Sequence, residues 1–583
     1  MDAARAAYRA AAEPRGLRSS LLKALVAGIL ALLFLSQGMT APFQKDEETR
    51  PAGIIVDIVN HGHWLIPDDL YGEATRKPPL YYWLGALVAE ARGGVVDEPG
   101  ARAVSLVAAA GIAGLVIVFT SINLDTSAGG LALLFLLGIY GFVSRGAHVR
   151  TDMLFTCFVF AAYCTLYPSV TGRGSIARVL AAGLLLGLAV MTKGPLAVVL
   201  PAFALVIYAV LRRTNPFRML AEPWPWIVLG LAAVIGALWY VPAFMRDPQL
   251  LRVQFFQENF GHLAPSDLGG TGEAARPFYY LWLRLIGAAL PLILYLPAAL
   301  ARRLPERKSQ DPVLYQLALM LAVLTIFTVA NSKRDIYILP ALPPLAIVLT
   351  APLVRYTVAS RSRLLAILTD GASVIAGLAM LTIAVAGLIL ASHPALIDRI
   401  TGSMQSSDAA YMTLLLRDLR SGEPRLVAAM IVVAASSIAA LWMVSARRSY
   451  GAAVAIGIAS MAAVSLWIGV LRPQFSHERT LKYFVMRAEP MVDHHELHVV
   501  GPPEYELSYY FGRGIPRWRR SMIRPGSPCP SYVILWNKRL DRVFRGVSIA
   551  PPPMLESNSM GNRGRLLLLN VGGAAGSPGC AER

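Results

Sequence analysis

The feature that most constrains the fold is a series of apolar runs, each long enough to cross a bilayer. A hydrocarbon core of about 30 Å requires roughly 20 apolar residues in a helix. A window of about 19 residues finds about thirteen such runs in this chain. The runs lie near residues 20–38, 100–121, 127–144, 152–169, 176–193, 195–211, 225–244, 278–300, 313–331, 337–356, 368–391, 426–445 and 450–471. They predict a polytopic α-helical membrane protein.

The composition supports this class. Of 583 residues, 55% are hydrophobic and 15% are charged, and the mean hydropathy of +0.52 is too apolar for a soluble globular protein. The formal net charge of +18 does not indicate nucleic-acid binding, because Lys and Arg are spread through short loops and are not gathered on one face. We expect membrane lipids around the protein and no nucleic-acid partner.

Basic residues predict the orientation, since cytoplasmic loops retain Lys and Arg. With the basic amino terminus inside, alternate loops carry arginine clusters such as Arg212 with Arg213. The opposite face of the membrane, here called the outer face, then holds 39–99, 145–151, 245–277, 332–336, 392–425 and everything after residue 472. The first 40 residues could instead be a cleaved signal peptide, but we favour an uncleaved first helix.

The chain divides into two parts after the last apolar run. We expect residues 1–471 to form a transmembrane domain and residues 472–583 a small soluble α/β domain on the outer face. In the second part "ELHVVG", "SYVILW" and "GRLLLLNV" predict strands, while "SPCPSY" and "GVSIAPPP" predict turns or edges. Cys529 and Cys580 lie there and could pair in an oxidising compartment.

Ionisable residues gather at the ends of the runs on the outer face, where they mark a functional site by default. Four clusters stand out: "QKDEETR" (44–50), "RKPPLYYW" (76–83), "RGAHVRTD" (145–152) and "NSKRDIYILPALPPLA" (331–346). The topology places all four on one side of the membrane. The first segment, 39–99, therefore carries candidate active-site residues.

The residue types in these clusters suit transfer to a hydroxyl group. Carboxylates at Asp46, Glu47 and Asp152 can accept a proton from a hydroxyl nucleophile. Cations at Lys77, Lys333 and Arg334 can neutralise an anionic leaving group such as phosphate. The aromatic string Tyr81-Tyr82-Trp83 offers surface to a sugar ring or to the lipid interface.

Each cluster also has a purely structural explanation. Lys77 and the two prolines after it could form a rigid turn, and residues 333–335 could form a solvated turn. Asp152 could cap the helix that follows it. For any one cluster considered alone, the structural explanation is preferable to the functional one. Because the clusters share one face, a common functional site is favoured.

Several motifs can be compared together with known families. They are an acidic motif in the first outer segment, Gly62-x-Trp64-x-x-Pro67, Lys77-Pro78-Pro79-Leu80-Tyr81-Tyr82-Trp83-Leu84, Arg150-Thr151-Asp152, Thr192-Lys193-Gly194-Pro195 and Tyr337-x-Leu339-Pro340-x-x-Pro343-Pro344-Leu345-Ala346. As a set they resemble the bacterial aminoarabinose transferase and protein O-mannosyltransferase-like group, membrane glycosyltransferases of the GT-C class. The likeness is strongest over residues 40–350, and "YELSYYFGRGIP" (505–516) resembles the family's carboxyl-terminal segment.

The resemblance implies a transferase that moves a monosaccharide from a polyprenyl-phosphate carrier to an acceptor hydroxyl on the periplasmic face. The acceptor would be a glycolipid such as lipid A, or a protein. The resemblance also implies that Asp152 flanks the reaction and that Lys77 contacts the carrier phosphate. Further phosphate and carrier contacts fall on Lys333, Arg334 and Tyr337. Other candidates for the pocket are Arg50, Tyr81, Tyr82, Arg150, His262 and Arg276.

The chain departs from the family pattern at two places. The family usually has Asp-Glu-x-Arg-Tyr where this chain has Asp46-Glu47-Glu48-Thr49-Arg50-Pro51, so two registers compete for the acid. An alignment that runs back without a gap from the motif that begins at Gly62 places Glu47 at the position of the family's acid. An alignment that matches the Asp-Glu pair itself places Asp46 there. We favour Glu47 and retain both. Arg76 stands where the aminoarabinose enzymes typically have Glu, which disfavours a cationic sugar nearby.

Metal ligation is weakly signalled. His61 and His63 alternate as on a strand, and His494 and His498 have a helical spacing, but "HHELH" lacks the His-Glu-x-x-His frame. A solvated surface is the default interpretation. GT-C relatives include enzymes with and without a divalent cation, so the cofactor stays open.

The expected mechanism is a single displacement with inversion at the anomeric carbon. Glu47 or Asp46 would act as general base, and Asp152 would orient the acceptor or the sugar. Lys77 and Arg334 would stabilise the departing phosphate. The alternative is a transporter or flippase of polyprenyl-linked sugars, but the internal repeats and broken midplane helices typical of transporters are not evident.

Overall fold

The computed structural model describes residues 15–43, 45–250, 276–301, 311–330, 332–353, 363–393, 416–419, 423–492, 495–518, 531–543, 552–558 and 564–571, with single residues between 394 and 422. Within this part of the chain, nine helices are long and apolar enough to span a membrane, or up to eleven if each of two bent pairs counts as one span. Ser19–Leu35 and Leu196–Leu211 are apolar but shorter. These helices coincide with the expected runs, so the predicted polytopic helical class is confirmed.

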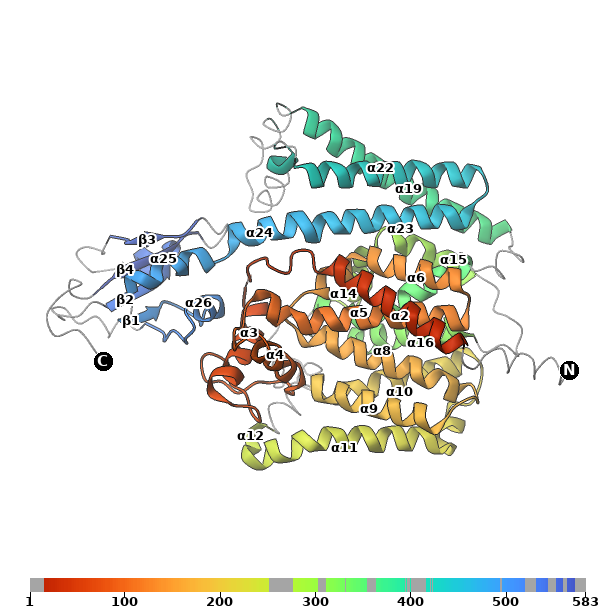
Figure 1. Ribbon diagram of the computed structural model, residues 1–583, viewed down its shortest axis with the longest axis horizontal. Helices are drawn as coiled ribbons and strands as arrows, with labels where there is room; N and C mark the ends of the chain where they lie inside the picture. Colours follow the sequence, from red (N-terminus) through yellow and green to blue (C-terminus); the bar gives the residue numbers. More distant parts are fainter. Residues whose placement is uncertain are drawn as a thin grey trace.

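The helices of the bundle run along the long axis of the molecule (Figure 1). They are α2 (Arg15–Leu35), α5 (Glu98–Asn123), α6 (Thr126–Gly138), α7 (Tyr140–Gly146), α8 (Thr151–Val170), α9 (Ile176–Lys193), α10 (Leu196–Leu211), α11 (Pro223–Arg246), α14 (Tyr280–Ala289), α15 (Leu296–Ala301), α16 (Pro312–Val329), α17 (Leu342–Thr350), α19 (Arg363–Ser392), α22 (Pro424–Ser445) and α23 (Ser449–Leu466). Short helical turns are η1 (Pro216–Ala221), α12 (Pro248–Leu250), η4 (Leu292–Tyr295), η5 (Asp335–Ala341) and η6 (Ala351–Leu353).

Aspartate side chains fix the starts of several of these helices. Before α5, Asp97 accepts a hydrogen bond from the backbone N–H of Gly100, and before α6, Asp125 accepts one from Ala128. Asp311 does the same for α16. A cap of this kind satisfies a backbone donor that the helix itself leaves unpaired. The boundaries of these helices are therefore set by local sequence.

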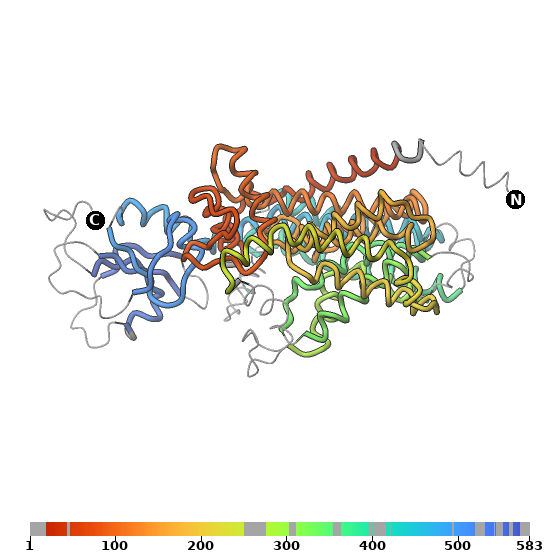
Figure 2. The backbone as a smooth tube through the Cα atoms, turned by 90° about the horizontal axis from the view of Figure 1, so that it is seen from below, coloured from red at the N-terminus to blue at the C-terminus, as the bar shows by residue number. Residues whose placement is uncertain are grey.

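Two helices outside the bundle build the segment between α2 and α5. They are α3 (Lys45–His61) and α4 (Leu80–Glu90), and both views place them between the bundle and the carboxyl-terminal sheet (Figures 1 and 2). Gly85 lets the two helices approach closely, because a Cβ there would lie 2.5 Å from Cδ1 of Ile55. The first outer segment is thus a folded unit with its own buried contacts.

The last membrane helix continues beyond the bundle towards the sheet. α23 passes through a π-helical turn (Trp467–Leu471) into α24 (Arg472–Arg479), and α25 (Lys482–Val492) follows. The expected domain boundary at residue 472 falls at the start of α24, while the sheet begins at Glu496. The boundary itself stays a prediction.

The carboxyl-terminal part contains a four-stranded sheet with the order β1-β2-β4-β3. Its strands are β1 (Glu496–Val499), β2 (Ser531–Trp536), β3 (Leu555–Glu556) and β4 (Leu566–Asn570), with short helices α26 (Tyr505–Tyr510), η9 (Asn537–Arg539) and α27 (Leu540–Val543). β1 is parallel to β2, and β4 is antiparallel to β2 and β3. The three predicted strands are confirmed as β1, β2 and β4. β3 was not predicted, because a strand of two residues shows no alternating pattern in the sequence. Cys529 and Cys580 lie outside the described residues.

α26 fastens this part of the chain to the first outer segment. The hydroxyl of Tyr505 donates to Oδ2 of Asp69 at 2.8 Å, and Oγ of Ser508 donates to the hydroxyl of Tyr71 at 2.7 Å. Both α26 residues belong to the string "YELSYY". The sheet part therefore contributes directly to the position of the first outer segment.

Glu506 is the residue we expect to hold α26 against the end of the long helix. Its buried carboxylate accepts from the backbone N–H of Leu481 at 2.7 Å and from the hydroxyl of Thr480 at 3.2 Å. Glu506→Ala should lower the free energy of unfolding by about 1–3 kcal/mol, because it leaves buried donors without their acceptor. Thermal unfolding in detergent measures this effect. The control is Glu489→Ala, which removes an exposed carboxylate of α25, and equal unfolding midpoints for the two variants would contradict the prediction.

Candidate active site

Glu48, in the first turn of α3, is the centre of a buried ion pair at the outer end of the bundle. Both of its carboxylate oxygens accept from the Arg102 guanidinium of α5, each at 2.9 Å. The remaining nitrogen of Arg102 donates to the backbone oxygens of Met39 at 2.7 Å and Ala41 at 2.5 Å. Arg102 is fully buried, so all its hydrogen bonds are made inside the protein. We call this pair the Glu48–Arg102 lock.

Two further elements meet at the lock. The backbone N–H of Val149 donates to Oε1 of Glu48 at 3.2 Å, and the Arg472 guanidinium of α24 lies 3.7 Å from Oε2. Burial alone would raise the pKa of Glu48, but the positive charges, of which Arg102 is the strongest, bring it well below its usual range. Glu48 is therefore ionised and fixes α3 against α5, the turn before α8 and α24.

Glu47, the preceding residue, points elsewhere. Its carboxylate is exposed and lies 3.1 Å from the Arg150 guanidinium. Asp46 belongs to α3, but its side chain lies outside what the structure describes. Of the two acids considered from the sequence, Glu47 is thus placed beside the Arg-Thr-Asp motif.

Asp152, in the first turn of α8, is buried between two cations. Oδ1 lies 2.5 Å from Nζ of Lys193, and Oδ2 lies 3.4 Å from Nε of Arg150. No side chain caps the start of α8, so the structure does not support the suggested role of Asp152 as a helix cap. Because Arg150 also contacts Glu47, one guanidinium joins the two carboxylates.

Lys193 reaches this site from the end of α9. The helix stops at Gly194, whose φ of +86° is strained for any residue with a side chain. The Lys193 ammonium also lies over the rings of Phe155, at 5.4 Å, and Tyr337, at 5.2 Å. The ring of Tyr337 in turn stacks on Phe327. The predicted carrier residue Tyr337 therefore lies beside the buried carboxylate.

Lys77 and the turn at residues 332–336 complete the charged surroundings. Lys77 lies close enough to the Asp152 carboxylate to interact with it electrostatically. Asp335 lies 2.6 Å from the Arg145 guanidinium and 3.2 Å from that of Arg284. Cations thus outnumber carboxylates around Asp152 among the described residues.

Lys333 and its neighbours do not form an ordinary solvated turn. Lys333 is buried and donates through Nζ to the backbone oxygen of Arg276 at 3.1 Å, and burial lowers its pKa. Arg334 is exposed. The side chain of Arg276 is also exposed, with its guanidinium 5.5 Å from the ring of Tyr280. A side-chain-to-backbone hydrogen bond therefore joins Lys333 to Arg276, while the place of both residues in a carrier pocket stays a prediction.

Other predicted pocket residues lie apart from this cluster. Arg50 pairs with Asp69 at 3.0 Å and packs over the ring of Tyr505, so it supports the junction with α26. Tyr81 and Tyr82 are buried in the core and do not offer aromatic surface to a sugar, which corrects the expectation for these two residues. Their helix turns them inward towards α3 and α5. His262 lies outside the described residues.

Sequence reasoning missed several residues that the structure brings together. Glu48 was considered only as part of a string, and Arg102 was not considered because it lies inside an apolar run. Lys193 was noted only as a member of the Thr192-Lys193-Gly194-Pro195 motif. A charged residue in or at the end of a membrane span is costly and is a usable signal. This signal would have identified Arg102 and Lys193 as candidate functional residues, but it would not have identified the carboxylates that pair with them.

Known structures share the whole fold. The crystal structure of ArnT from Cupriavidus metallidurans bound to undecaprenyl phosphate superposes with a TM-score of 0.72 and 16% identity, over 97% of this chain and 99% of that one. The apo structure of the same protein gives 0.70, over 96% and 100%. At this identity the likeness establishes the fold alone. This chain therefore shares the fold of that protein.

Comparison of the sequence with known families and curated proteins identifies relatives of this chain. Residues 76–240 match the family described as dolichyl-phosphate-mannose-protein mannosyltransferase. The undecaprenyl phosphate-alpha-4-amino-4-deoxy-L-arabinose arabinosyl transferase of Aeromonas salmonicida is 30% identical over 319 residues, 53% of this chain and 56% of the relative. That of Erwinia tasmaniensis is 29% identical over 313 residues, 52% and 54%. The chain thus spans about half the length of the curated relatives it matches, and its predicted resemblance to the aminoarabinose transferase group is confirmed.

Substitution of Glu48 should destabilise the protein more than substitution of Glu47. Glu48→Gln should lower the free energy of unfolding by about 3 kcal/mol, because it leaves the buried Arg102 without its carboxylate. Glu47→Gln should change it by less than about 1 kcal/mol, since its ion pair is exposed. Thermal unfolding in detergent measures both variants. A Glu48→Gln protein as stable as wild type would show that the lock is dispensable.

The lock should also have a pH signature. A carboxylate whose pKa is depressed by folding stabilises the protein above its unfolded pKa, about 4.3 for glutamate, and loses this contribution as the pH falls through the folded pKa. The stability difference between wild type and Glu48→Gln should therefore be constant from about pH 8 to pH 5 and shrink only in stronger acid. Chemical unfolding at a series of pH values measures the difference. A difference that already disappears near pH 6 would contradict an ionised, paired Glu48.

Proposed function

We propose that this multi-pass membrane protein transfers 4-amino-4-deoxy-L-arabinose from undecaprenyl phosphate to a hydroxyl of lipid A. The observation that carries the proposal is the buried carboxylate of Asp152 between Lys193 and Arg150, with Lys77 nearby. The segment that matches the mannosyltransferase family, residues 76–240, contains all four residues. The names of the relatives supply the sugar and the carrier.

The cations suit a departing lipid phosphate. In the donor, the phosphate links the sugar to the polyprenol and carries one negative charge. When the bond between the anomeric carbon and the phosphate oxygen breaks, the carrier leaves as a monoester with a second charge. Lys193, Arg150 and Lys77 lie where fixed positive charge can stabilise that developing charge.

Glu47 is the general base in this proposal. Its carboxylate is exposed, so the acceptor can reach it, and it lies 3.1 Å from the Arg150 guanidinium. Glu47 takes the proton as the acceptor oxygen forms its bond to the anomeric carbon from the side opposite the phosphate. Inversion at that carbon follows from a single displacement.

Asp152 has a positioning role. Its carboxylate is buried and already engaged by Lys193 and Arg150, so it is less accessible to an acceptor than the exposed carboxylate of Glu47. It holds the two cations close together despite their mutual repulsion, and Arg150 then reaches Glu47. Lys333, Arg334, Tyr337 and Arg276 are the candidates for further contacts with the carrier.

Arg76 is compatible with an amino sugar. Its side chain is exposed to solvent, where water and salt screen its charge. The substitution of the family's glutamate at this position therefore does not by itself exclude the cationic donor. We place the amino terminus in the cytoplasm and the carboxyl-terminal sheet in the periplasm of a bacterial inner membrane, which brings the cluster to the face where lipid A is exposed.

Transfer assays with purified protein test the proposal. Labelled aminoarabinose on undecaprenyl phosphate is supplied with lipid A, and Glu47→Gln, Asp152→Asn and Lys193→Met are compared with wild type. Loss of the base should lower the rate by about 10²- to 10⁴-fold. Glu90→Gln, which removes an exposed carboxylate at the end of α4, is the control and should retain the wild-type rate.

Two comparisons make the assay decisive. Asp46→Asn tests the competing register, since a large loss there with normal Glu47→Gln activity would move the base to Asp46. A donor carrying mannose in place of aminoarabinose tests the sugar, since faster transfer of mannose would overturn the amino-sugar assignment. Movement of the donor across vesicles without any transfer would instead support the flippase alternative.

A further inference from the structure

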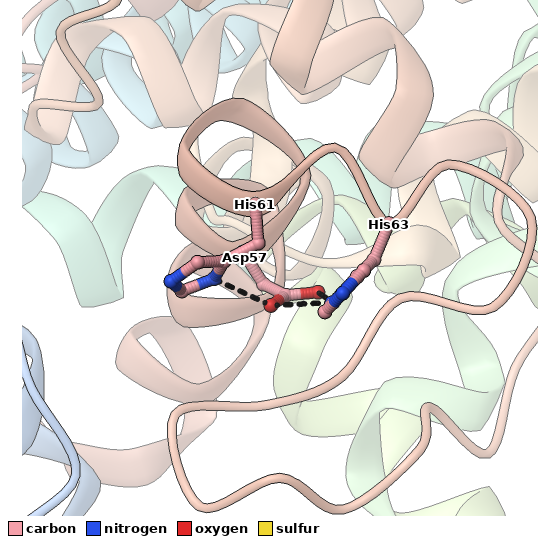
Figure 3. Close-up of side chains that lie close together, drawn as sticks. All are labelled: Asp57, His61 and His63. Carbon is pink, nitrogen blue, oxygen red and sulfur yellow. Dashed lines mark hydrogen bonds and ion pairs between the residues drawn. The ribbon is translucent and has the colours of Figure 1, made fainter.

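A second polar cluster lies at the other end of α3. Asp57 is buried on this helix, His61 follows one turn later at its end, and His63 stands just beyond Gly62. Figure 3 shows the two imidazoles on either side of the Asp57 carboxylate. Nδ1 of His61 lies 2.9 Å from Oδ1, and Nδ1 of His63 lies 3.1 Å from both carboxylate oxygens.

The fold, and not a regular strand, brings the histidines together. Gly62 has a φ of +71°, a conformation that glycine adopts without strain. The turn is held by the backbone N–H of Trp64, which donates to the oxygen of Gly62 at 2.9 Å. The indole of Trp83 in α4 donates to the oxygen of Trp64 at 2.6 Å. His63 is therefore directed back to Asp57 by contacts from two elements.

The carboxylate is oriented from the opposite side. The backbone N–H of Asp68 donates to Oδ2 of Asp57 at 2.9 Å. A backbone donor of this kind fixes the plane of a carboxylate and is the usual second contact of a metal ligand. Asp57 therefore meets the two imidazoles in a set orientation.

The ligand atoms have nearly the spacing that zinc requires. They all lie within 4.8 Å of one another, and the pairs that touch are 2.9–3.1 Å apart. A tetrahedral zinc ion with ligands at about 2.0–2.1 Å places those ligands about 3.3 Å apart. An ion between the three groups requires each imidazole nitrogen to move a few tenths of an ångström away from the Asp57 carboxylate, and the two imidazole nitrogens, which lie within 4.8 Å of each other, to approach to about 3.3 Å. Two imidazoles with one carboxylate are donors that zinc prefers.

We propose that Asp57, His61 and His63 bind a zinc ion that fastens the end of α3 to the chain leading into residues 64–68. The side chains of His61 and His63 are 63% and 50% exposed, so the ion can enter from solvent and water can supply the fourth ligand. The unpaired imidazole edges face outward. The ion takes the place of the direct contacts between the two Nδ1 atoms and the Asp57 carboxylate.

The site acts on structure and not on sugar transfer. Glu47 and Asp57 are ten residues apart on one helix, a separation of about 15 Å at 1.5 Å per residue. The zinc site therefore holds the far end of the helix whose first turn carries the lock. Zinc should stabilise the first outer segment without contacting the reacting groups.

Zinc content and thermal unfolding test the site. The protein is purified through a tag without histidine, stripped with a chelator, incubated with zinc sulfate and dialysed. Wild type should retain about one zinc per chain and unfold at a higher temperature with zinc than without it. His61→Ala combined with His63→Ala should lose both effects and keep the unfolding temperature of the stripped wild type.

A matched double variant controls for histidine number. His393→Ala combined with His477→Ala removes two exposed histidines elsewhere and should retain zinc like wild type. Asp57→Asn, which keeps an oxygen acceptor but removes the charge, should weaken zinc retention at least tenfold. Zinc retained by the His61 and His63 variant, or no zinc retained by wild type, would overturn the proposal.

Discussion

The buried pair of Glu48 and Arg102 is the interaction on which the outer end of this protein depends. A guanidinium inside an apolar helix bundle is costly unless its donors are all met, and Arg102 meets them with one carboxylate and two backbone oxygens. The same carboxylate accepts from Val149 and lies near Arg472. One ion pair thus holds the first outer segment, the turn before α8 and the last helix in a single arrangement.

The lock explains how adjacent acidic residues acquire different roles. With Glu48 turned into the protein, Glu47 is left exposed on the neighbouring side of α3, where Arg150 meets it. Arg150 also contacts Asp152, which is held by Lys193. The proposed base and the proposed phosphate-binding cations are therefore linked through one guanidinium. Chemistry at the membrane surface requires such an arrangement, because a lipid phosphate and an acceptor hydroxyl must meet at one depth.

Much of the fold could be predicted from the sequence, but the candidate site only in part. The apolar runs and the three longer strands were identified because periodicity and run length are local properties. Asp152, Lys77 and Glu47 were singled out from their motifs; Glu47 and Asp152 share Arg150, and Lys77 interacts with Asp152, while their roles stay predictions. Tyr81 and Tyr82 were placed on a surface because a string of aromatic residues does not reveal which face of a helix is buried. Arg102 was missed because its partner Glu48 lies 54 residues away.

The sequence by itself determined that this chain is a multi-pass membrane protein with charged clusters at one face and a small sheet at its end. Run length, charge bias and strand pattern are sufficient for that, since each is decided within a few tens of residues. The tertiary structure decided which acid is buried, which cation meets it, and which histidines share a carboxylate. Those choices depend on contacts between segments such as α3, α5, α8 and α9, and the free energy of a buried charge is set by the partner that packing supplies.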